Sequence, residues 1–105
     1  MTTYTVSAGH AGIEPYTTTA SQVDTITFTD NVNNVQVISD GGAEVRVTID
    51  GTTSPAIGSA GASSPAYRMP AGTVSTLDIP LRASVDTIKL VSSGAAVVSV
   101  QQKLS

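Results

Sequence analysis

The sequence predicts an all-β domain, an antiparallel β-sandwich of about seven or eight short strands. Apolar and polar residues alternate with a period of two in several short segments, and Gly, Pro, Asn and Asp separate these segments. No stretch shows the i, i+3, i+4, i+7 spacing of an amphipathic helix over a useful length. The pattern is compatible with an immunoglobulin-like or a jelly-roll-like strand order.

The clearest strand covers residues 43–50, where apolar side chains occupy the odd positions and polar side chains the even ones. A β-branched segment at 34–39 precedes it. Between the two lies Asp40-Gly41-Gly42, a short Gly-rich connection of the kind that suits a tight turn. The sequence therefore predicts a β-hairpin over residues 34–50.

The same alternation predicts the remaining strands. In residues 73–81 the apolar positions are Leu77, Ile79 and Leu81, and Pro80 between them indicates an edge strand or a strand end because it has no N–H. Ser92-Ser93-Gly94 predicts a hairpin-like turn before the last strand. The other expected strands cover 24–29, 86–91 and 95–102, with further strands at 3–8 and, more weakly, at 16–19.

Two stretches depart from this pattern and define the expected domain organisation. Residues 22–105 are expected to form the sandwich, with a long loop at 51–66 that is small, uncharged and rich in Gly, Ser, Ala and Pro. Connections longer than about 12–15 residues are unusual in compact domains, so this loop is either a flexible surface loop or one that orders against a partner. Residues 1–21 are either an N-terminal arm or a first strand followed by a loop.

Composition excludes several functional classes. The 105 residues carry a net charge of −3 with only five scattered basic residues, so no nucleic-acid surface is expected. No apolar run approaches the roughly 20 residues that span a bilayer, and no secretory signal opens the chain. Cysteine is absent, which excludes disulfides and thiolate metal sites and fits synthesis in a reducing cytosol.

The residues that could support catalysis or hold a metal are few. His10 is the single histidine and is flanked by Gly9, Ala11 and Gly12, and no Gly-x-Ser-x-Gly motif or phosphate-binding glycine loop occurs. The densest group of oxygen donors, Asp30, Asn31, Asn33 and Asn34, is better explained as turn residues than as calcium ligands. Aspartates that precede glycine, at positions 40 and 50, are also expected in turns. The sequence thus predicts a protein that is not an enzyme, with no cofactor and no metal.

From residue 34 to about residue 101 the order of segments resembles a known class of protein. A Val/Ile strand precedes VRVTIDGT at 45–52, a variable Ser/Gly/Pro loop follows, and then come YRMPAG at 67–72 and DTIKLVSSGAAVVSV at 86–100. This order of segments resembles that of the small β-sandwich accessory proteins of tailed bacteriophage virions, some of which are head decoration or minor capsid proteins. The resemblance carries over no functional residue.

The resemblance implies a structural virion protein that is made in the host cytoplasm, binds the head lattice and stabilises it. Its partners would be the major capsid protein or other virion proteins, and it would form a homo-oligomer, expected as a trimer. The alternatives are a phage tail or neck component, or a β-sandwich module that recognises a glycan or a cell surface through loop 51–66. The large or charged side chains expected at a protein interface are Tyr4, His10, Tyr16, Tyr67 and Arg68.

Overall fold

A computed structural model describes residues 2–30, 34–58, 60–80 and 86–103. Its regular structure in these residues is entirely β, which confirms the predicted all-β class. The nine strands are β1 (Thr2–Val6), β2 (Tyr16–Thr17), β3 (Asp24–Phe28), β4 (Asn34–Ser39), β5 (Val45–Thr48), β6 (Tyr67–Met69), β7 (Ser75–Pro80), β8 (Thr87–Ser92) and β9 (Val97–Lys103).

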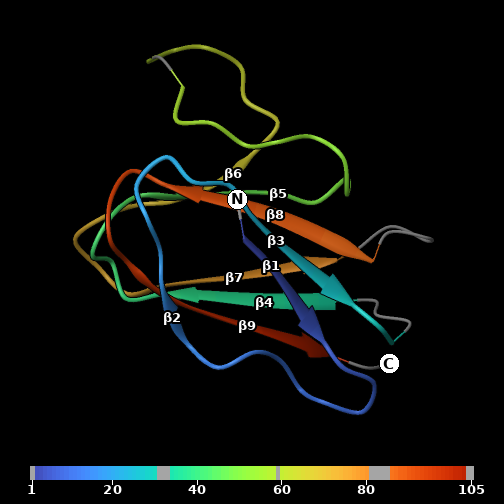
Figure 1. The fold of residues 1–105 in the computed structure, drawn as a ribbon. Helices are drawn as coiled ribbons and strands as arrows, with labels where there is room; N and C mark the ends of the chain where they lie inside the picture. The colour runs from blue at the N-terminus through green and yellow to red at the C-terminus, as the bar shows by residue number, and fades with distance from the viewer. Residues whose placement is uncertain (1, 31–33, 59, 81–85, 104–105) are drawn as a thin grey trace.

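The strands form two sheets that pack face to face (Figure 1). The five-stranded sheet has the order β1-β3-β8-β5-β6, and the four-stranded sheet has the order β2-β9-β4-β7. The described strands slightly outnumber the seven or eight expected, because the three-residue strand β6 is too short to show an alternating pattern. The sandwich prediction is confirmed.

The strand order distinguishes between the two predicted arrangements. β2 pairs with β9, β3 with β8, β4 with β7 and β5 with β6, and all four pairs are antiparallel. The chain from β2 onward is therefore one long hairpin, with β2 to β5 as the outgoing arm and β6 to β9 as the returning arm. The hairpin is rolled so that most successive strands alternate between the sheets, which is the jelly-roll arrangement of eight strands.

β1 lies outside this set of eight strands. It joins the edge of the five-stranded sheet beside β3, with Thr2 opposite Asp24 and Val6 opposite Phe28. This pair is parallel, so the expectation of a purely antiparallel sandwich is wrong at this edge. The parallel direction follows from the topology, because the chain crosses to the other sheet at β2 before it returns to β3.

The predicted hairpin over residues 34–50 is wrong. β4 belongs to the four-stranded sheet and β5 to the five-stranded sheet, so the chain crosses from one layer to the other between them. Gly41 has a φ of 84°, and its carbonyl accepts a 2.8 Å hydrogen bond from the N–H of Gly72. The Asp40 carboxylate accepts from the N–H groups of Gly42 and Val97, at 2.9 and 3.1 Å. These bonds attach the turn to the β6–β7 connection and to the start of β9 instead of closing a hairpin.

The predicted hairpin-like turn at 92–94 is wrong for the same reason. It joins β8 of the five-stranded sheet to β9 of the four-stranded sheet. The buried Ser92 hydroxyl lies 2.7 Å from the Thr18 hydroxyl and also donates to the Gly94 carbonyl at 2.7 Å. Alternation shows only that both strands direct apolar side chains toward the core. Two strands do this equally well whether they lie in the same sheet or in facing sheets.

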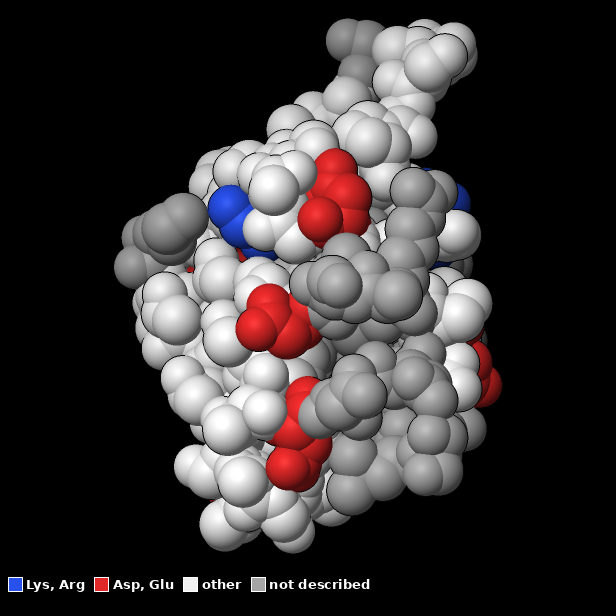
Figure 2. Space-filling view, turned by 90° about the vertical axis from the view of Figure 1, so that its right-hand side faces the viewer, with Lys and Arg blue, Asp and Glu red and all other residues white. Residues whose placement is uncertain are grey.

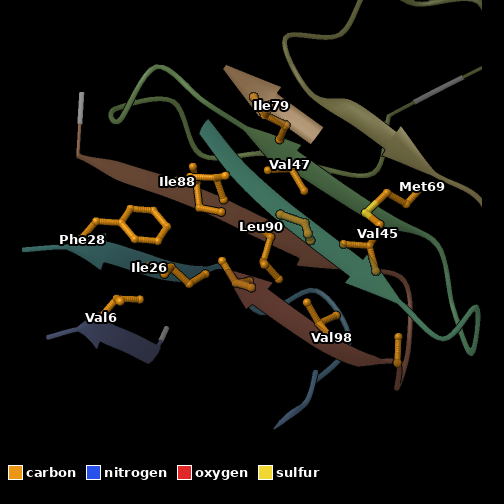
Figure 3. Close-up of a cluster of buried hydrophobic side chains, with 14 of the residues drawn as sticks. Val6, Ile26, Phe28, Val45, Val47, Met69, Ile79, Ile88, Leu90 and Val98 are labelled. Atoms are coloured by element: carbon orange, nitrogen blue, oxygen red, sulfur yellow. The ribbon is translucent and has the colours of Figure 1, made fainter. Parts of the chain in front are cut away.

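The core lies between the sheets and consists of the inward-facing side chains (Figure 3). It is mainly aliphatic, as expected from a composition with 4% aromatic residues. Pro80 ends β7 at the edge of the four-stranded sheet, which confirms its predicted position. Leu81, Asn31 and Asn33 lie outside the described residues. The buried hydrophobic residues are Val6, Ile26, Phe28, Val35, Val37, Ala43, Val45, Val47, Met69, Ile79, Ile88, Leu90, Val91, Ala96, Val98 and Val100.

Candidate functional site

The five side chains expected at an interface lie in different parts of the fold. Tyr4 is on β1, at one edge of the five-stranded sheet, and Tyr67 and Arg68 are on β6, at the opposite edge. Tyr16 is on β2 in the other sheet, and His10 lies in the connection between β1 and β2. The structure brings Tyr4 together with Tyr16, but Tyr67 and Arg68 are consecutive on β6 and point to opposite faces, so the five do not form one surface.

Tyr4 and Tyr16 pack on each other and on the core. Their ring centroids are 4.5 Å apart, and both side chains are half-buried. The Tyr16 hydroxyl donates a 3.0 Å hydrogen bond to the carboxylate of Asp24, which also accepts from Gln22 at 2.9 Å and is buried. Burial, reinforced by the neighbouring Asp24 carboxylate, raises the pKa of Tyr16. These tyrosines fasten the N-terminal segment to the sandwich.

The His10 region is held to β9 through its main chain. The His10 carbonyl accepts a hydrogen bond from the Gln102 side-chain amide, which also donates to Asp30 at 3.1 Å. The same Asp30 oxygen accepts from the N–H of Gly9 at 2.8 Å. The imidazole is exposed, with Nδ1 3.3 Å from the Ala8 carbonyl. His10 therefore lies at the surface, on a segment whose backbone is held by hydrogen bonds to Gln102 and Asp30.

Arg68 belongs to a small charged group on the outer face of the five-stranded sheet. The Glu44 carboxylate accepts from Nε of Arg46 at 3.1 Å and from Nε of Arg68. The Arg68 guanidinium, with a smaller contribution from Arg46, lowers the pKa of Glu44. Because Glu44 balances part of this charge, Arg68 does not present a strongly basic surface.

Loop 51–66 joins β5 to β6, so it forms the tip of the rolled hairpin (Figure 1). Its first part lies on the outer face of the five-stranded sheet, where Thr53 accepts from the Thr48 hydroxyl and Thr52 from Lys89 at 3.4 Å. Pro55 in this part is buried. From residue 56 to residue 64 every described residue is exposed, and this part stands away from the sheet.

A hollow of about 510 Å³ lies at the base of this loop, lined by Ile49, Asp50, Ser64, Pro65, Ala66 and Tyr67. The Tyr67 side chain is 50% exposed at its rim. Figure 2 shows a face on which most of the described residues are uncharged, with several acidic side chains and a few basic ones near its edges. Residues 56–67 include no charged residue, Asp50 is the charged residue among those that line the hollow, and Tyr67 contributes an exposed aromatic ring. We call residues 56–58 and 60–67 the tip surface.

Asp50 organises the start of the loop. Its carboxylate accepts from the N–H groups of Thr52 and Thr53, at 3.0 and 2.8 Å, and from the Thr53 hydroxyl. The hydroxyl bond and then the two N–H bonds lower the pKa of Asp50 to about 2. The expectation that Asp50 is a turn residue is confirmed, and the same holds for Asp40, whose carboxylate bonds lower its pKa.

The turn around Asp50 is expected to open in strong acid. Because the pKa is lower in the folded chain than the ordinary 3.8, ionised Asp50 stabilises the turn above that value, and the stabilisation is lost as the pH falls toward about 2. We expect the amide resonances of Thr52 and Thr53 to titrate with a midpoint near pH 2 in an NMR pH series. The Asp50→Asn variant should lack this titration, and a midpoint near 3.8 in the unmodified chain would contradict the assignment.

Sequence reasoning missed three exposed aliphatic side chains, Ile57, Val74 and Val97, which are 40%, 68% and 41% exposed. For Val97 a signal existed, because alternation places it on the face of its strand opposite the buried Val98 and Val100. Alternation in the predicted strand 73–81 also places Val74 on the face opposite Leu77 and Ile79, whereas Ile57 lies in the loop, where alternation gives no information. Within the described ranges, no three His, Asp or Glu side chains come close enough together to hold a metal ion.

None of the described segments is a helix long and apolar enough to cross a membrane. Comparison of the chain with protein-family models, with curated proteins and with solved structures finds no match. The functional argument therefore depends on the residues and their geometry.

Proposed function

We propose that this protein is a structural component of a tailed-phage virion, of the head decoration or minor capsid type, which binds the head lattice through its tip surface. The observation that carries the proposal is the exposed, uncharged loop beside Tyr67 at the end of a tightly packed sandwich. Its partner would be the major capsid protein, and it would be made in the host cytoplasm and incorporated into the particle.

Two physical arguments support a protein partner. Small uncharged side chains lose little hydration when they are covered, whereas charged side chains lose much more. An exposed tyrosine with an apolar body and a hydroxyl is the kind of residue that often dominates binding energy in protein interfaces. Jelly rolls also occur in viral capsid domains.

The test is cosedimentation of the purified protein with expanded heads of the phage that would encode it. We expect saturable binding that Tyr67→Ala weakens about tenfold, which is a typical effect for an interface tyrosine. Val74→Ala, which truncates an exposed side chain outside the tip surface, is the matched control and should bind normally. Failure of the unmodified protein to sediment with heads would refute the proposal.

A second candidate function is recognition of a glycan at the same place, favoured by the hollow beside the exposed Tyr67 ring. Jelly rolls also occur in lectins, and aromatic rings present an apolar body that can pack on a sugar. The Asp50 carboxylate, however, is already engaged by Thr52 and Thr53, which leaves less of it for sugar hydroxyls. A glycan array, followed by an NMR titration that monitors residues 64–67, distinguishes this candidate from lattice binding.

A further inference from the structure

The four edge strands of the sandwich differ in how well they are protected from pairing with another chain. β2 has two residues and β6 has three, and β7 carries Asp78 and Pro80. Short length, charge and proline are the means by which proteins prevent strands from adding to a sheet edge. β1 has five residues, Thr-Thr-Tyr-Thr-Val, with no charge and no proline. All five are residue types that favour strands.

The outward-facing backbone groups of β1 can be identified from its pairing. The Val6 carbonyl accepts a 3.1 Å hydrogen bond from the N–H of Thr29, so Val6 directs its backbone groups toward β3. Residues two apart in a strand point the same way, which leaves the N–H and C=O of Thr3 and Thr5 directed away from the sheet. Among the described residues, none of the turn and loop backbone hydrogen bonds involves Thr3 or Thr5.

We propose that the occupant of this edge is β1 of a second copy of the chain, paired antiparallel about a twofold axis at Tyr4. Thr3 would then exchange backbone hydrogen bonds with the partner's Thr5, and the reverse pair follows by symmetry. A twofold pair places β1 against an identical β1. Because β1 has no charged residue, no like charges face each other across the pair. The two five-stranded sheets become one continuous sheet.

This pairing is weaker than an obligate interface. Two five-residue strands joined at their edges bury much less than the roughly 1,200 Å² of a stable protein interface, so the dimer should depend on concentration. Its twofold symmetry differs from the trimer expected from the sequence. The inference does not depend on the proposed function, because it concerns the isolated protein in solution.

Sedimentation velocity of the full chain over a concentration series tests the pairing. We expect the average mass to rise with concentration from 10.6 kDa toward twice that value. Thr5→Pro removes an outward N–H without removing a β1–β3 bond, and Thr5→Lys brings like charges onto the symmetric pair. Both variants should remain monomeric throughout the series. Thr27→Lys, a matched change on the neighbouring strand and the same face, should associate like the unmodified chain.

Cysteine cross-linking provides an independent measurement, because the chain has no cysteine of its own. Directly opposed, hydrogen-bonded residues of antiparallel strands have Cα atoms about 5.5 Å apart, a distance that a disulfide spans. A mixture of the Thr3→Cys and Thr5→Cys proteins should therefore oxidise to the mixed dimer at least about tenfold faster than either protein alone dimerises. An unmodified chain that stays monomeric at the highest concentration, or association that both Thr5 variants leave intact, overturns the inference. Loss of binding to phage heads would not affect it.

Discussion

Replacing Phe28 with alanine is expected to lower the free energy of unfolding by about 3–5 kcal/mol. Phe28 is the only phenylalanine of the chain and is 1% exposed, and its ring points into the same layer as Ile26 and Ile88 (Figure 3). Its removal leaves a cavity that aliphatic neighbours on rigid strands cannot fill. Because small domains are stable by only about 5–15 kcal/mol, the loss is a large part of the total.

Urea denaturation monitored by circular dichroism measures this change. Val74→Ala is the matched control, because it also truncates an apolar side chain but at a position that is 68% exposed. Surface truncations of this kind usually change stability by less than about 0.5 kcal/mol. A loss below about 1 kcal/mol for Phe28→Ala would mean that the sandwich does not enclose the ring as described.

Gly41→Ala is expected to lower the free energy of unfolding by about 3 kcal/mol, against about 1 kcal/mol for Gly72→Ala. Both glycines have left-handed backbone, with φ values of 84° and 91°, so alanine is strained at either position. At Gly41 an added Cβ would also lie 2.4 Å from the Thr73 carbonyl oxygen, whereas at Gly72 it would meet nothing within 4 Å.

The comparison separates backbone strain from the steric clash. The turn at Gly41 carries the chain from one sheet to the other, so a shift there disturbs both layers. Thermal and urea unfolding of the two variants measure the difference. Equal losses would show that the approach of Thr73 to this turn contributes nothing to stability.

Alternation predicted the fold class because it indicates which side chains are buried, and the observed burial of residues 43–47 follows it most clearly. It could not predict the neighbours of a strand, since burial is the same whichever strand lies beside it. The two predicted hairpins were wrong for this reason. The choice between sheets depends on contacts distant in sequence, such as the hydrogen bond from Val97 to the Asp40 carboxylate.

The candidate site was predictable only in part. Loop 51–66 and Tyr67 stood out by composition, and the structure places them together at the tip of the rolled hairpin. Tyr4 and Tyr16 also stood out, but the buried Asp24 that holds Tyr16 could not be recognised. A lone aspartate at the start of a strand resembles a turn residue until its partner, a tyrosine on a strand of the other sheet, is known.

The rolled hairpin also determines how quickly this chain can reach its native state. Its outermost strand pair joins Tyr16 and Thr17 to Val98 and Val97, so segments near opposite ends of the polypeptide must meet. Domains dominated by such distant pairings refold in milliseconds to seconds, far more slowly than helical bundles of similar size. Until β9 arrives between β2 and β4, β2 has no partner in its sheet and β4 keeps one open edge, and crowded nascent chains are exposed to aggregation during that interval.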